Sequence, residues 1–396
     1  MRILVVQESD WLRRGPHQQH QLMERLQQRG HDVRVIDYEI AWRENSNREF
    51  FASKTVLRAP GKVSDRVLTT IIRPAMIRAP LLCYLLIPIF HSLEIIRQIK
   101  SFKPDIIMGM GILNTLSAAL IAKLYRVPFL YYLIDSLHTL VPERLLRPIA
   151  KLMEKWTISI SDNILVINQS LSLYAKRMGS VSIPEVLTAG IDSNRFHSEV
   201  ESQSKRIEMG FEEDDLVLFF MGWLYEFSGL LEVAQDIVSH PNPNVKLLIL
   251  GRGDLFDQLQ TIVRNQNHQK RVALVDWVRY DEVPSYIAVA DICILPANLN
   301  EIMREIVPIK LYEYLACGKP VVVTKLPGVF REFGVRSGIV YADDPKSVVE
   351  LALNIFQNKE KYSQLSRDAI RFTASLDWSE ITNRFESVLS DMVPEY

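Results

Sequence analysis

The sequence predicts an α/β protein of two domains, each built on a parallel, doubly wound sheet of the Rossmann type. The chain has 396 residues, more than one hydrophobic core usually supports. Short apolar runs alternate with amphipathic stretches, the order that gives parallel strands joined by right-handed crossover helices. This alternation starts again near residue 215, after a polar, charge-rich run at 193–213 that we take as the linker. We therefore expect two such domains, with a cleft between them.

The first domain is expected to span residues 1–195. Ile3–Val6 is an apolar run without helical period, typical of a strand buried on both faces. A helix that opens at Gly15-Pro16 and ends at Gly30 follows it. The further strands that we expect here are 33–36, 105–108, 129–134 and 164–167, with one helix through 116–120 and another that begins near 169.

The second domain is expected to span residues 196–378. Its strands have the same short, buried character, which favours a second parallel sheet. They are predicted at 216–221, 245–250, 272–275, 292–295 and 321–324.

Charge is unevenly divided between the two halves. Residues 1–195 carry 26 Lys/Arg and 17 Asp/Glu, whereas the whole chain carries 46 and 47. The basic first half is suited to an anionic partner such as a membrane surface. Three widely spaced cysteines give no disulfide or metal-ligand pattern, and the N-terminal apolar run is too short for a signal peptide. We expect a cytoplasmic protein.

The segment Thr69–Phe90 is strongly apolar, but arginines and prolines interrupt it, so we expect no clean membrane span of ~20 residues. Residues 51–104 carry nine Lys/Arg and two Asp/Glu. Basic and apolar character together favour an element in a membrane interface, on the inner face of the cell membrane. The alternative is a helix buried against the first sheet with its arginines directed outward.

The most informative stretch is residues 305–323. Pro308 is typical of the first residue of a helix, Gly318 of its C-terminal cap, and 321–324 of the next strand. The first amides of this helix lack intrahelical partners and form an anion site at the positive end of the helix dipole. They belong to Ile309, Lys310 and Leu311.

Two carboxylates, Glu305 and Glu313, bracket this helix start. The arrangement is poor for phosphate alone, but it suits a ligand with both anionic oxygens and neutral hydroxyls, such as a sugar nucleotide. Solvated charges on a surface helix are the alternative interpretation.

The stretch, with Tyr-Leu-Ala-Cys-Gly-Lys-Pro-Val-Val after its second Glu, resembles the E-x7-E signature of the family-4 retaining glycosyltransferases, which have the two-domain GT-B fold. The resemblance implies that Glu305 faces the donor sugar and that Glu313 binds the nucleotide ribose. It implies a donor in the second domain, an acceptor against the first, and no metal or other cofactor. It also implies that a last helix, residues 379–391, packs back on the first domain.

In the first domain the resemblance points to two positions. Gly15 follows the first strand, where the family has a glycine-rich turn at the donor or acceptor. A structural turn is the alternative for this single glycine. His138 follows the strand 129–134, where family members carry a His that contacts the donor sugar, with Asp135 as the alternate polar contact.

In the second domain Gly222 resembles the first glycine of a Gly-Arg…Lys-Gly turn whose cations neutralise the donor diphosphate. Trp223 and Ser228 stand at the positions of the Arg and the Lys, so both charges are missing. A leaving diphosphate needs compensating charge. We expect Lys310 to supply it, with Arg304 and Arg252 as alternatives.

Gly251, Arg252 and Gly253 resemble the family's Gly-x-Gly turn next to the nucleotide, and Arg279 lies where the base is usually bound. The prediction is a retaining, metal-independent glycosyltransferase that uses a nucleotide-diphosphate sugar and a glycoconjugate acceptor, such as a lipid-linked or cell-envelope glycan. Nucleic acid is not an expected partner. A non-catalytic partner subunit, a sugar-nucleotide epimerase and a phosphorylase are the alternatives.

Overall fold

The computed structural model describes residues 1–13, 15–38, 50–79, 82–141, 143–266, 270–301, 303–304 and 306–393. The chain forms two compact units. Unit 1 comprises Met1–Thr188 and Trp378–Tyr396, and unit 2 comprises Ala189–Asp377. The 193–213 run predicted as a linker lies inside unit 2, where Phe196 is buried in the core, so that interpretation is wrong.

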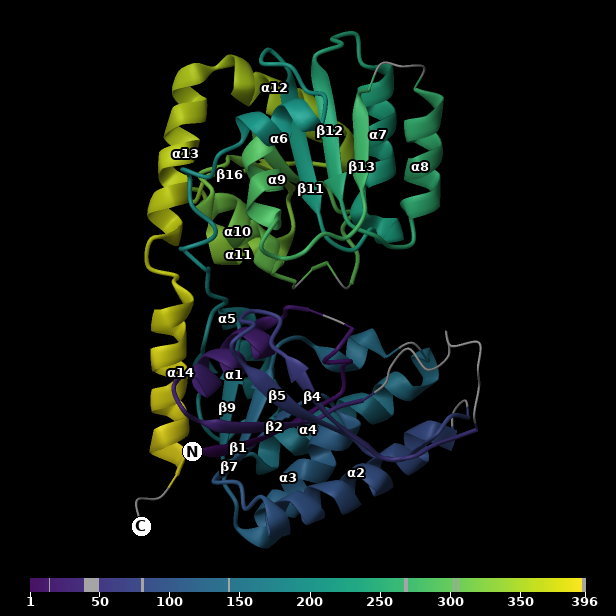
Figure 1. Cartoon of the computed structure of the whole chain (residues 1–396), viewed down its shortest axis with the longest axis vertical. Helices are drawn as coiled ribbons and strands as arrows, with labels where there is room; N and C mark the ends of the chain where they lie inside the picture. The colour runs from purple at the N-terminus through teal and green to yellow at the C-terminus, as the bar shows by residue number, and fades with distance from the viewer. Residues whose placement is uncertain are drawn as a thin grey trace. The chain divides into compact units, whose positions relative to one another are not determined.

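Unit 1 contains an eight-stranded sheet in the order β10-β9-β8-β7-β1-β2-β5-β4 (Figure 1). All neighbouring strands pair in parallel except β4 and β5, which are antiparallel. The strands of unit 1 are β1 (Arg2–Gln7), β2 (Asp32–Ile36), β3 (Phe51–Ala52), β4 (Thr55–Pro60), β5 (Leu68–Arg73), β6 (Met76–Ile77), β7 (Ile106–Met110), β8 (Phe129–Leu133), β9 (Asn163–Val166) and β10 (Glu185–Val186).

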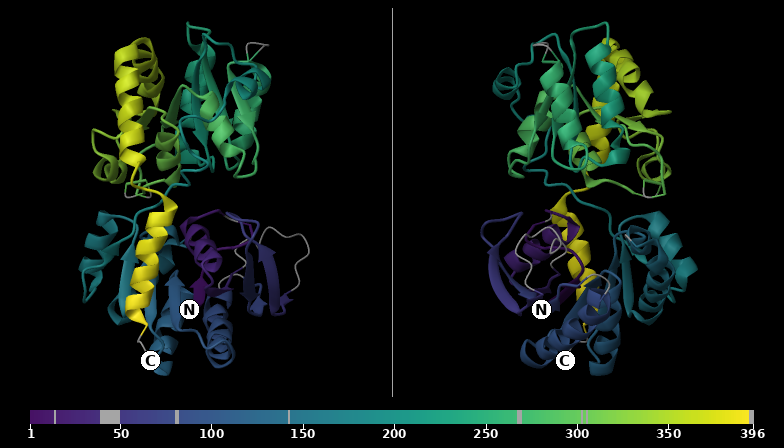
Figure 2. Two further views of the ribbon diagram at one scale, coloured as in Figure 1. Left: turned by 60° about the vertical axis from the view of Figure 1, so that its left-hand side comes forward. Right: turned by 90° about the vertical axis from the view of Figure 1, so that its right-hand side faces the viewer.

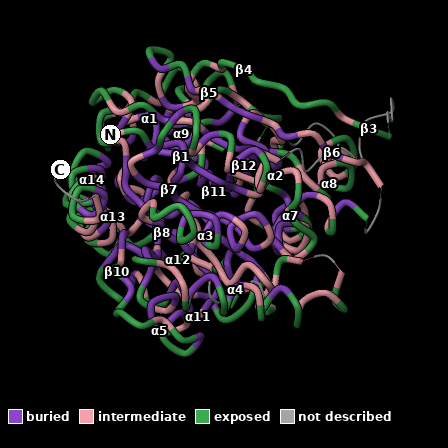
Figure 3. Tube along the Cα trace, turned by 90° about the horizontal axis from the view of Figure 1, so that it is seen from below, coloured by how far each residue is buried: buried purple, intermediate pink, exposed green. Residues whose placement is uncertain are grey.

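Helices cover both faces of this sheet. The helices of unit 1 are α1 (Gln18–Gln28), α2 (Leu82–Ser101), α3 (Leu113–Tyr125), α4 (Arg147–Ile160), α5 (Gln169–Met178) and α14 (Trp378–Met392), with 3-10 turns η2 (Leu137–Leu140) and η3 (Arg144–Leu146). Side chains alternate along β1: Ile3 and Val5 enter the core under α1 and α14, whereas Leu4 enters the core under α2–α5. The burial-coloured trace shows the strands β1, β7 and β8 buried (Figure 3), and α14 runs beside α1 (Figure 2).

Unit 2 contains a six-stranded parallel sheet in the order β13-β12-β11-β14-β15-β16. Its strands are β11 (Leu216–Met221), β12 (Val245–Leu250), β13 (Val272–Val275), β14 (Ile292–Leu295), β15 (Val321–Thr324) and β16 (Ile339–Ala342). Its helices are α6 (Gln203–Glu208), α7 (Leu230–Ser239), α8 (Phe256–Asn265), α9 (Val283–Val289), α10 (Ile309–Ala316), α11 (Pro327–Phe333), α12 (Val348–Gln357) and α13 (Lys359–Thr373), with 3-10 turns η4 (Glu226–Ser228) and η5 (Pro345–Ser347).

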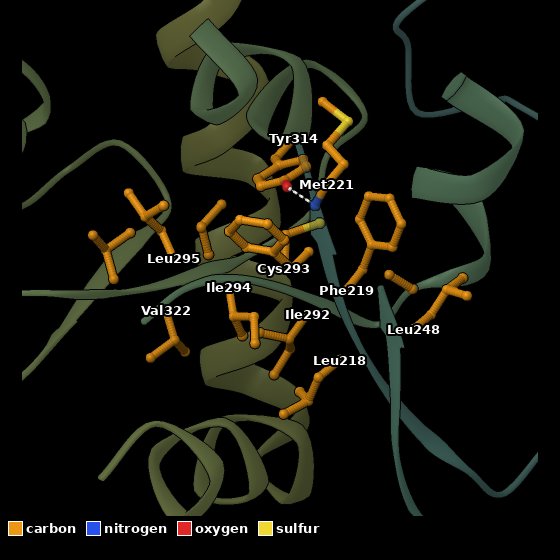
Figure 4. Close-up of a cluster of buried hydrophobic side chains, with 14 of the residues drawn as sticks. Leu218, Phe219, Met221, Leu248, Ile292, Cys293, Ile294, Leu295, Tyr314 and Val322 are labelled. Carbon is orange, nitrogen blue, oxygen red and sulfur yellow. Dashed lines mark hydrogen bonds between the residues drawn. The ribbon is translucent and has the colours of Figure 1, made fainter. Parts of the chain in front are cut away.

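One continuous core fills unit 2 (Figure 4). The hydroxyl of Tyr314, on α10, accepts a 2.8 Å hydrogen bond from the amide of Met221 at the end of β11. This buried bond fixes α10 against the strand whose carboxyl end leads into Gly222. The α/β class and the two parallel sheets are confirmed.

The segment Thr69–Phe90 differs from the prediction of one interfacial element. Its first part is β5, which buries Ile71 and Ile72 in the sheet, and only its last part enters α2. Helix α2 is long and apolar enough to cross a membrane by length and composition. It shares only residues 82–90 with the segment in which no clean span was expected, and that expectation stays a prediction. The helix packs on α3 and β6, and it buries His91, Glu94 and Gln98.

Candidate functional site

The helix predicted at Pro308 is α10, which begins at Ile309 with Pro308 as its N-cap residue. Gly318 follows its end with a φ of +68°, as a C-terminal glycine cap requires. The amide of Leu311 donates a 3.1 Å hydrogen bond to the carbonyl of Pro308. The prediction that the Leu311 amide is unpartnered is therefore wrong, and its side chain belongs to the core. Ile309 packs partly buried against the same core.

Glu313 lies on the inner side of α10 and is 7% exposed. The hydroxyl of Tyr280, in the segment between β13 and α9, donates a 2.8 Å hydrogen bond to Oε1 of Glu313. Burial raises the pKa of the Glu313 carboxyl to about 7, although the Tyr280 bond and the charge of Lys310 oppose this shift. With this pKa the carboxyl group is partly protonated near pH 7, so it carries less than a full negative charge while its oxygens can still accept hydrogen bonds from ligand hydroxyls.

Lys310 crosses from α10 to the end of β11. Its ammonium lies 4.2 Å from the ring centroid of Phe220, within cation–π range. A Cβ built on Gly222 would lie only 2.5 Å from Nζ of Lys310, and Gly222 has a φ of +123°. The positive φ favours glycine at this position, and a side chain there would displace the end of the flexible lysine. Burial lowers the pKa of Lys310 to about 8, and the charge of Glu313 opposes that shift.

The other glycine turn, after β12, packs directly on the Gly222 turn. A Cβ on Gly251 would lie 2.0 Å from the carbonyl oxygen of Gly222, and one on Gly253 would lie 2.5 Å from the amide nitrogen of Leu224. The amide of Leu224 donates to the carbonyl of Arg252 at 2.9 Å. The structure therefore brings Gly222, Gly251 and Gly253 together at the carboxyl edge of the sheet, where ligands of open α/β sheets bind.

The predicted arginines lie on the surface of unit 2. Arg252 is 56% exposed, with Nη2 3.2 Å from Oδ2 of Asp276. Arg279 is 72% exposed and paired with Asp281 at 3.0 Å. The side chain of Arg304 is exposed. Since Lys310 is the cation against the Gly222 turn, it is the best placed of these four residues to act there.

The positions of the missing cations are occupied differently. Ser228 is buried, whereas Trp223 is 46% exposed. The ring of Trp223 lies 6.5 Å from that of Trp277 and 6.3 Å from that of Tyr225. Trp277 and Tyr225 are likewise about half exposed. An exposed aromatic cluster therefore borders the glycine turns where the family pattern has positive charge.

His138 lies in η2 of unit 1 and is oriented by a buried pair. Its Nδ1 lies 2.8 Å from Oε2 of Glu154, and the Tyr174 hydroxyl donates to the same oxygen at 2.6 Å. Glu154 is fully buried on α4. In the arrangement where Nδ1 of His138 donates to this carboxyl oxygen, Nε2 can accept a hydrogen bond from a ligand. Burial raises the pKa of the alternate contact, Asp135, to about 6.

Gly15 follows β1 with a φ of +98°. A Cβ there would lie 2.7 Å from the ring of His20, whose Nδ1 accepts from the His17 amide at 3.1 Å. Burial lowers the pKa of His20 to about 3, so this ring is neutral and structural. The geometry of Gly15 fits the alternative that it makes a structural turn.

Glu305 lies outside the described residues. Among the residues that the structure does describe, no group of three or more His, Cys, Asp or Glu side chains could hold a metal ion. The sequence interpretation missed Tyr280, Glu154 and Tyr174. In the sequence, Glu154 stands on the side of its helix opposite the large apolar residues, and this position is the signal that could have singled it out.

Two family models match the chain. The model of Glycosyltransferase Family 4 matches residues 18–195, and that of Glycosyl transferases group 1 matches residues 201–372. An uncharacterized glycosyltransferase of Methanocaldococcus jannaschii, MJ1607, is 26% identical over 203 residues, which are 48% of this chain and 50% of that protein. The putative teichuronic acid biosynthesis glycosyltransferase TuaH of Bacillus subtilis is 33% identical over 104 residues, 25% of each chain. The chain thus matches half or less of the length of these relatives.

Solved structures match over the whole chain. Anabaena HepE in complex with UDP-glucose has a TM-score of 0.74 at 16% identity, covering 99% of this chain and 100% of that one. Sucrose-phosphate synthase of Thermosynechococcus elongatus has a TM-score of 0.75 at 15% identity, covering 99% of each chain. At these identities the likeness shows the GT-B fold. Since the two family models together match residues 18–195 and 201–372, which include the E-x7-E stretch, the chain belongs to the group 1, family-4 glycosyltransferases with the GT-B fold.

Proposed function

We propose that this chain transfers a sugar from a nucleotide-diphosphate donor to an acceptor hydroxyl, with retention of anomeric configuration and without a metal ion. The observation that carries the proposal is the position of Lys310, whose ammonium lies against Gly222 and Phe220. When the glycosidic bond to the donor breaks, negative charge builds on the leaving diphosphate. One cation fixed at this turn stabilises that charge in the transition state.

Glu313 is proposed to bind the ribose of the donor. Its Oε1 is held by Tyr280, which fixes the carboxyl group in one orientation. Hydroxyls of a ribose donate hydrogen bonds, and a preoriented carboxylate accepts them with charge assistance. The aromatic cluster of Trp223, Tyr225 and Trp277 offers planar faces at the same edge.

The proposal includes two further residue roles and the class of acceptor. His138 contacts the donor sugar through Nε2, Glu305 faces the same sugar, and the acceptor is a lipid-linked or cell-envelope glycan. The first role is supported by the buried Glu154, which sets the ring of His138. The second rests on the family signature. We propose a cytoplasmic site of action, at the inner face of the cell membrane.

Thermal shift and calorimetry with UDP, GDP and ADP test donor binding, since a ligand of the folded state raises the melting temperature. UDP is the first probe, because HepE has been solved with UDP and UDP-glucose. The anomeric configuration of the transfer product, followed by NMR with EDTA present, then tests the reaction. Nucleotide binding without donor cleavage or transfer would favour the non-catalytic subunit. Release of an epimer would indicate an epimerase, and dependence on free phosphate a phosphorylase.

A further inference from the structure

Helix α4 in unit 1 is amphipathic in the reverse of the usual sense. Its inner side buries Glu154 and Thr157 along with Ala150 and Ile158. The outer side carries large apolar residues three and four positions apart, which is the spacing of one helix face. They are Ile149, Leu152 and Trp156, with exposed fractions of 58%, 47% and 53%, and Leu145 in the preceding turn η3 is 91% exposed.

Helix α2 repeats this arrangement. It buries His91, Glu94 and Gln98 against unit 1, while its outer side carries a second apolar stripe. The stripe consists of Leu82, Leu85, Ile89 and Leu93, with exposed fractions of 42%, 71%, 55% and 57%. The buried glutamates have partners within unit 1, since Glu154 bonds to His138 and Glu94 pairs with Lys54. No described residue of unit 1, however, covers the two exposed apolar stripes.

Helix α3 is in contact with both of these helices. It adds Leu120 and Leu124 to the exposed surface, and Leu124 is 77% exposed. The three helices thus share one outer face, which we call the α2–α4 face. Apolar patches of this extent mark interaction sites.

The exposed charges on the α2–α4 face are mainly positive. The acidic side chains of the three helices, Glu94 and Glu154, are buried, and the half-buried Glu143 beside η3 accepts a hydrogen bond from the Tyr84 hydroxyl of α2. Exposed cations lie among the apolar residues, namely Lys123, Arg126, Arg144, Lys151 and Lys155. A surface hollow of about 650 Å³ beside α4 is bordered by Lys151, Lys155 and Arg177, with Leu152 and Tyr174 also in its lining.

We propose that the α2–α4 face docks on an anionic lipid bilayer. Leucines and a tryptophan enter the interface, while lysines extend to anionic head groups. A second copy of this chain would bring like charges together, which makes the bilayer the better partner. Because the inner side of α2 packs its polar residues on the protein, the helix lies along the interface in this arrangement. The assignment keeps helix α2 from the 51–104 segment named in the sequence analysis and adds helices α3 and α4.

Vesicle flotation at low salt tests this proposal with the full chain. Wild-type protein is expected to float with vesicles of phosphatidylcholine and phosphatidylglycerol, and less with phosphatidylcholine alone or at high salt. The variant Lys151→Glu/Lys155→Glu, and separately Ile149→Ser/Leu152→Ser, should lower the partition coefficient by about tenfold or more. The matched control is Ile207→Ser/Val335→Ser on unit 2, whose residues are 69% and 73% exposed, and it should float like wild type.

Thermal melting and UDP affinity show whether each variant is folded, so loss of flotation is separable from unfolding and from failure of the donor proposal. The bilayer assignment is overturned if wild type does not float with anionic vesicles, or if both α4 variants float as well as it does. A concentration-dependent dimer that the serine variant abolishes, with no vesicle binding, would assign the face to a second copy instead.

Discussion

The ammonium of Lys310 lies 4.2 Å from the ring centroid of Phe220, two residues before the Gly222 turn. The lysine comes from α10, and the ring comes from β11. This contact holds the positive charge of Lys310 beside the Gly222 turn. The family pattern has Arg and Lys in that turn, where this chain has Trp223 and Ser228. The side-chain bond between Tyr314 and the Met221 amide holds the same helix and strand together, so the charge is preorganised.

Replacing Lys310 by alanine is expected to lower turnover by roughly a hundredfold or more, with a smaller effect on donor binding. The reason is that the charge acts on the diphosphate as it leaves. The measurement is steady-state kinetics of Lys310→Ala compared with Arg252→Ala and Arg304→Ala. Both arginines are exposed, so their replacement by alanine is expected to change turnover less. If Lys310→Ala keeps near-wild-type turnover and either arginine variant loses it, that arginine supplies the compensating charge and the assignment of Lys310 is wrong.

Restoring the family's cation should rescue that variant. Trp223 is 46% exposed, so an arginine there disturbs no core packing. In the Lys310→Ala background, Trp223→Arg is expected to raise turnover by about tenfold or more. The reason is that the new arginine and the lost lysine both supply positive charge to the same turn. Trp223→Gln in that background is the neutral control. Equal rates for the arginine and glutamine variants would contradict the shared role.

The ratio kcat/KM should also fall as pH rises through the pKa of Lys310. Burial lowers that pKa from 10.5 to about 8, so the ammonium of the ligand-free protein is present below pH 8 and is lost above it. Lys310→Arg keeps its charge at every accessible pH. The measurement is the pH dependence of kcat/KM for both proteins, because that profile reports the groups of the ligand-free enzyme. If the decrease near pH 8 occurs in wild type and equally in Lys310→Arg, the residue that titrates there is not Lys310.

The central strands were predictable because strands buried on both faces are continuous apolar runs. All five strands expected in the second domain, such as Leu216–Met221, have the predicted bounds. The edge strands β4 and β16 were missed, since they are partly exposed and lack that pattern. The place of Lys310 beside the helix start was predictable, whereas its role toward the diphosphate stays a prediction. Tyr280 was not, because it precedes Glu313 by 33 residues and meets it only in the folded chain.

Glu154 is expected to fix the orientation of His138. Glu154→Gln keeps the size but presents an amide to Nδ1, so kcat should fall, and nitrogen NMR of the His138 ring should show that the proton is no longer held on Nδ1. Tyr174→Phe removes only the second bond to Oε2 and is the milder control. An unchanged ring spectrum and an unchanged kcat in Glu154→Gln would reduce Glu154 to a packing residue.

Glu313→Gln should weaken nucleotide binding roughly tenfold or more, because charge-assisted hydrogen bonds to the ribose are lost. It should also change stability in a pH-dependent way. Burial raises the pKa of Glu313 from 4.5 to about 7, so the folded state favours the protonated form. That contribution is full below pH 4.5 and is lost as pH rises through 7. Glutamine stays neutral, so the variant should gain stability relative to wild type between pH 5 and pH 8.

Glu332 provides the matched control for this prediction. It also lies in unit 2, its pKa is also raised by burial, and it accepts a 2.7 Å hydrogen bond from the hydroxyl of Tyr312, as Glu313 does from Tyr280. Glu332→Gln should show the same sign of pH-dependent stabilisation in denaturant unfolding but unchanged UDP affinity in calorimetry. If Glu313→Gln binds UDP as wild type does, or if both variants lose affinity equally, the carboxyl group of Glu313 does not bind the ribose.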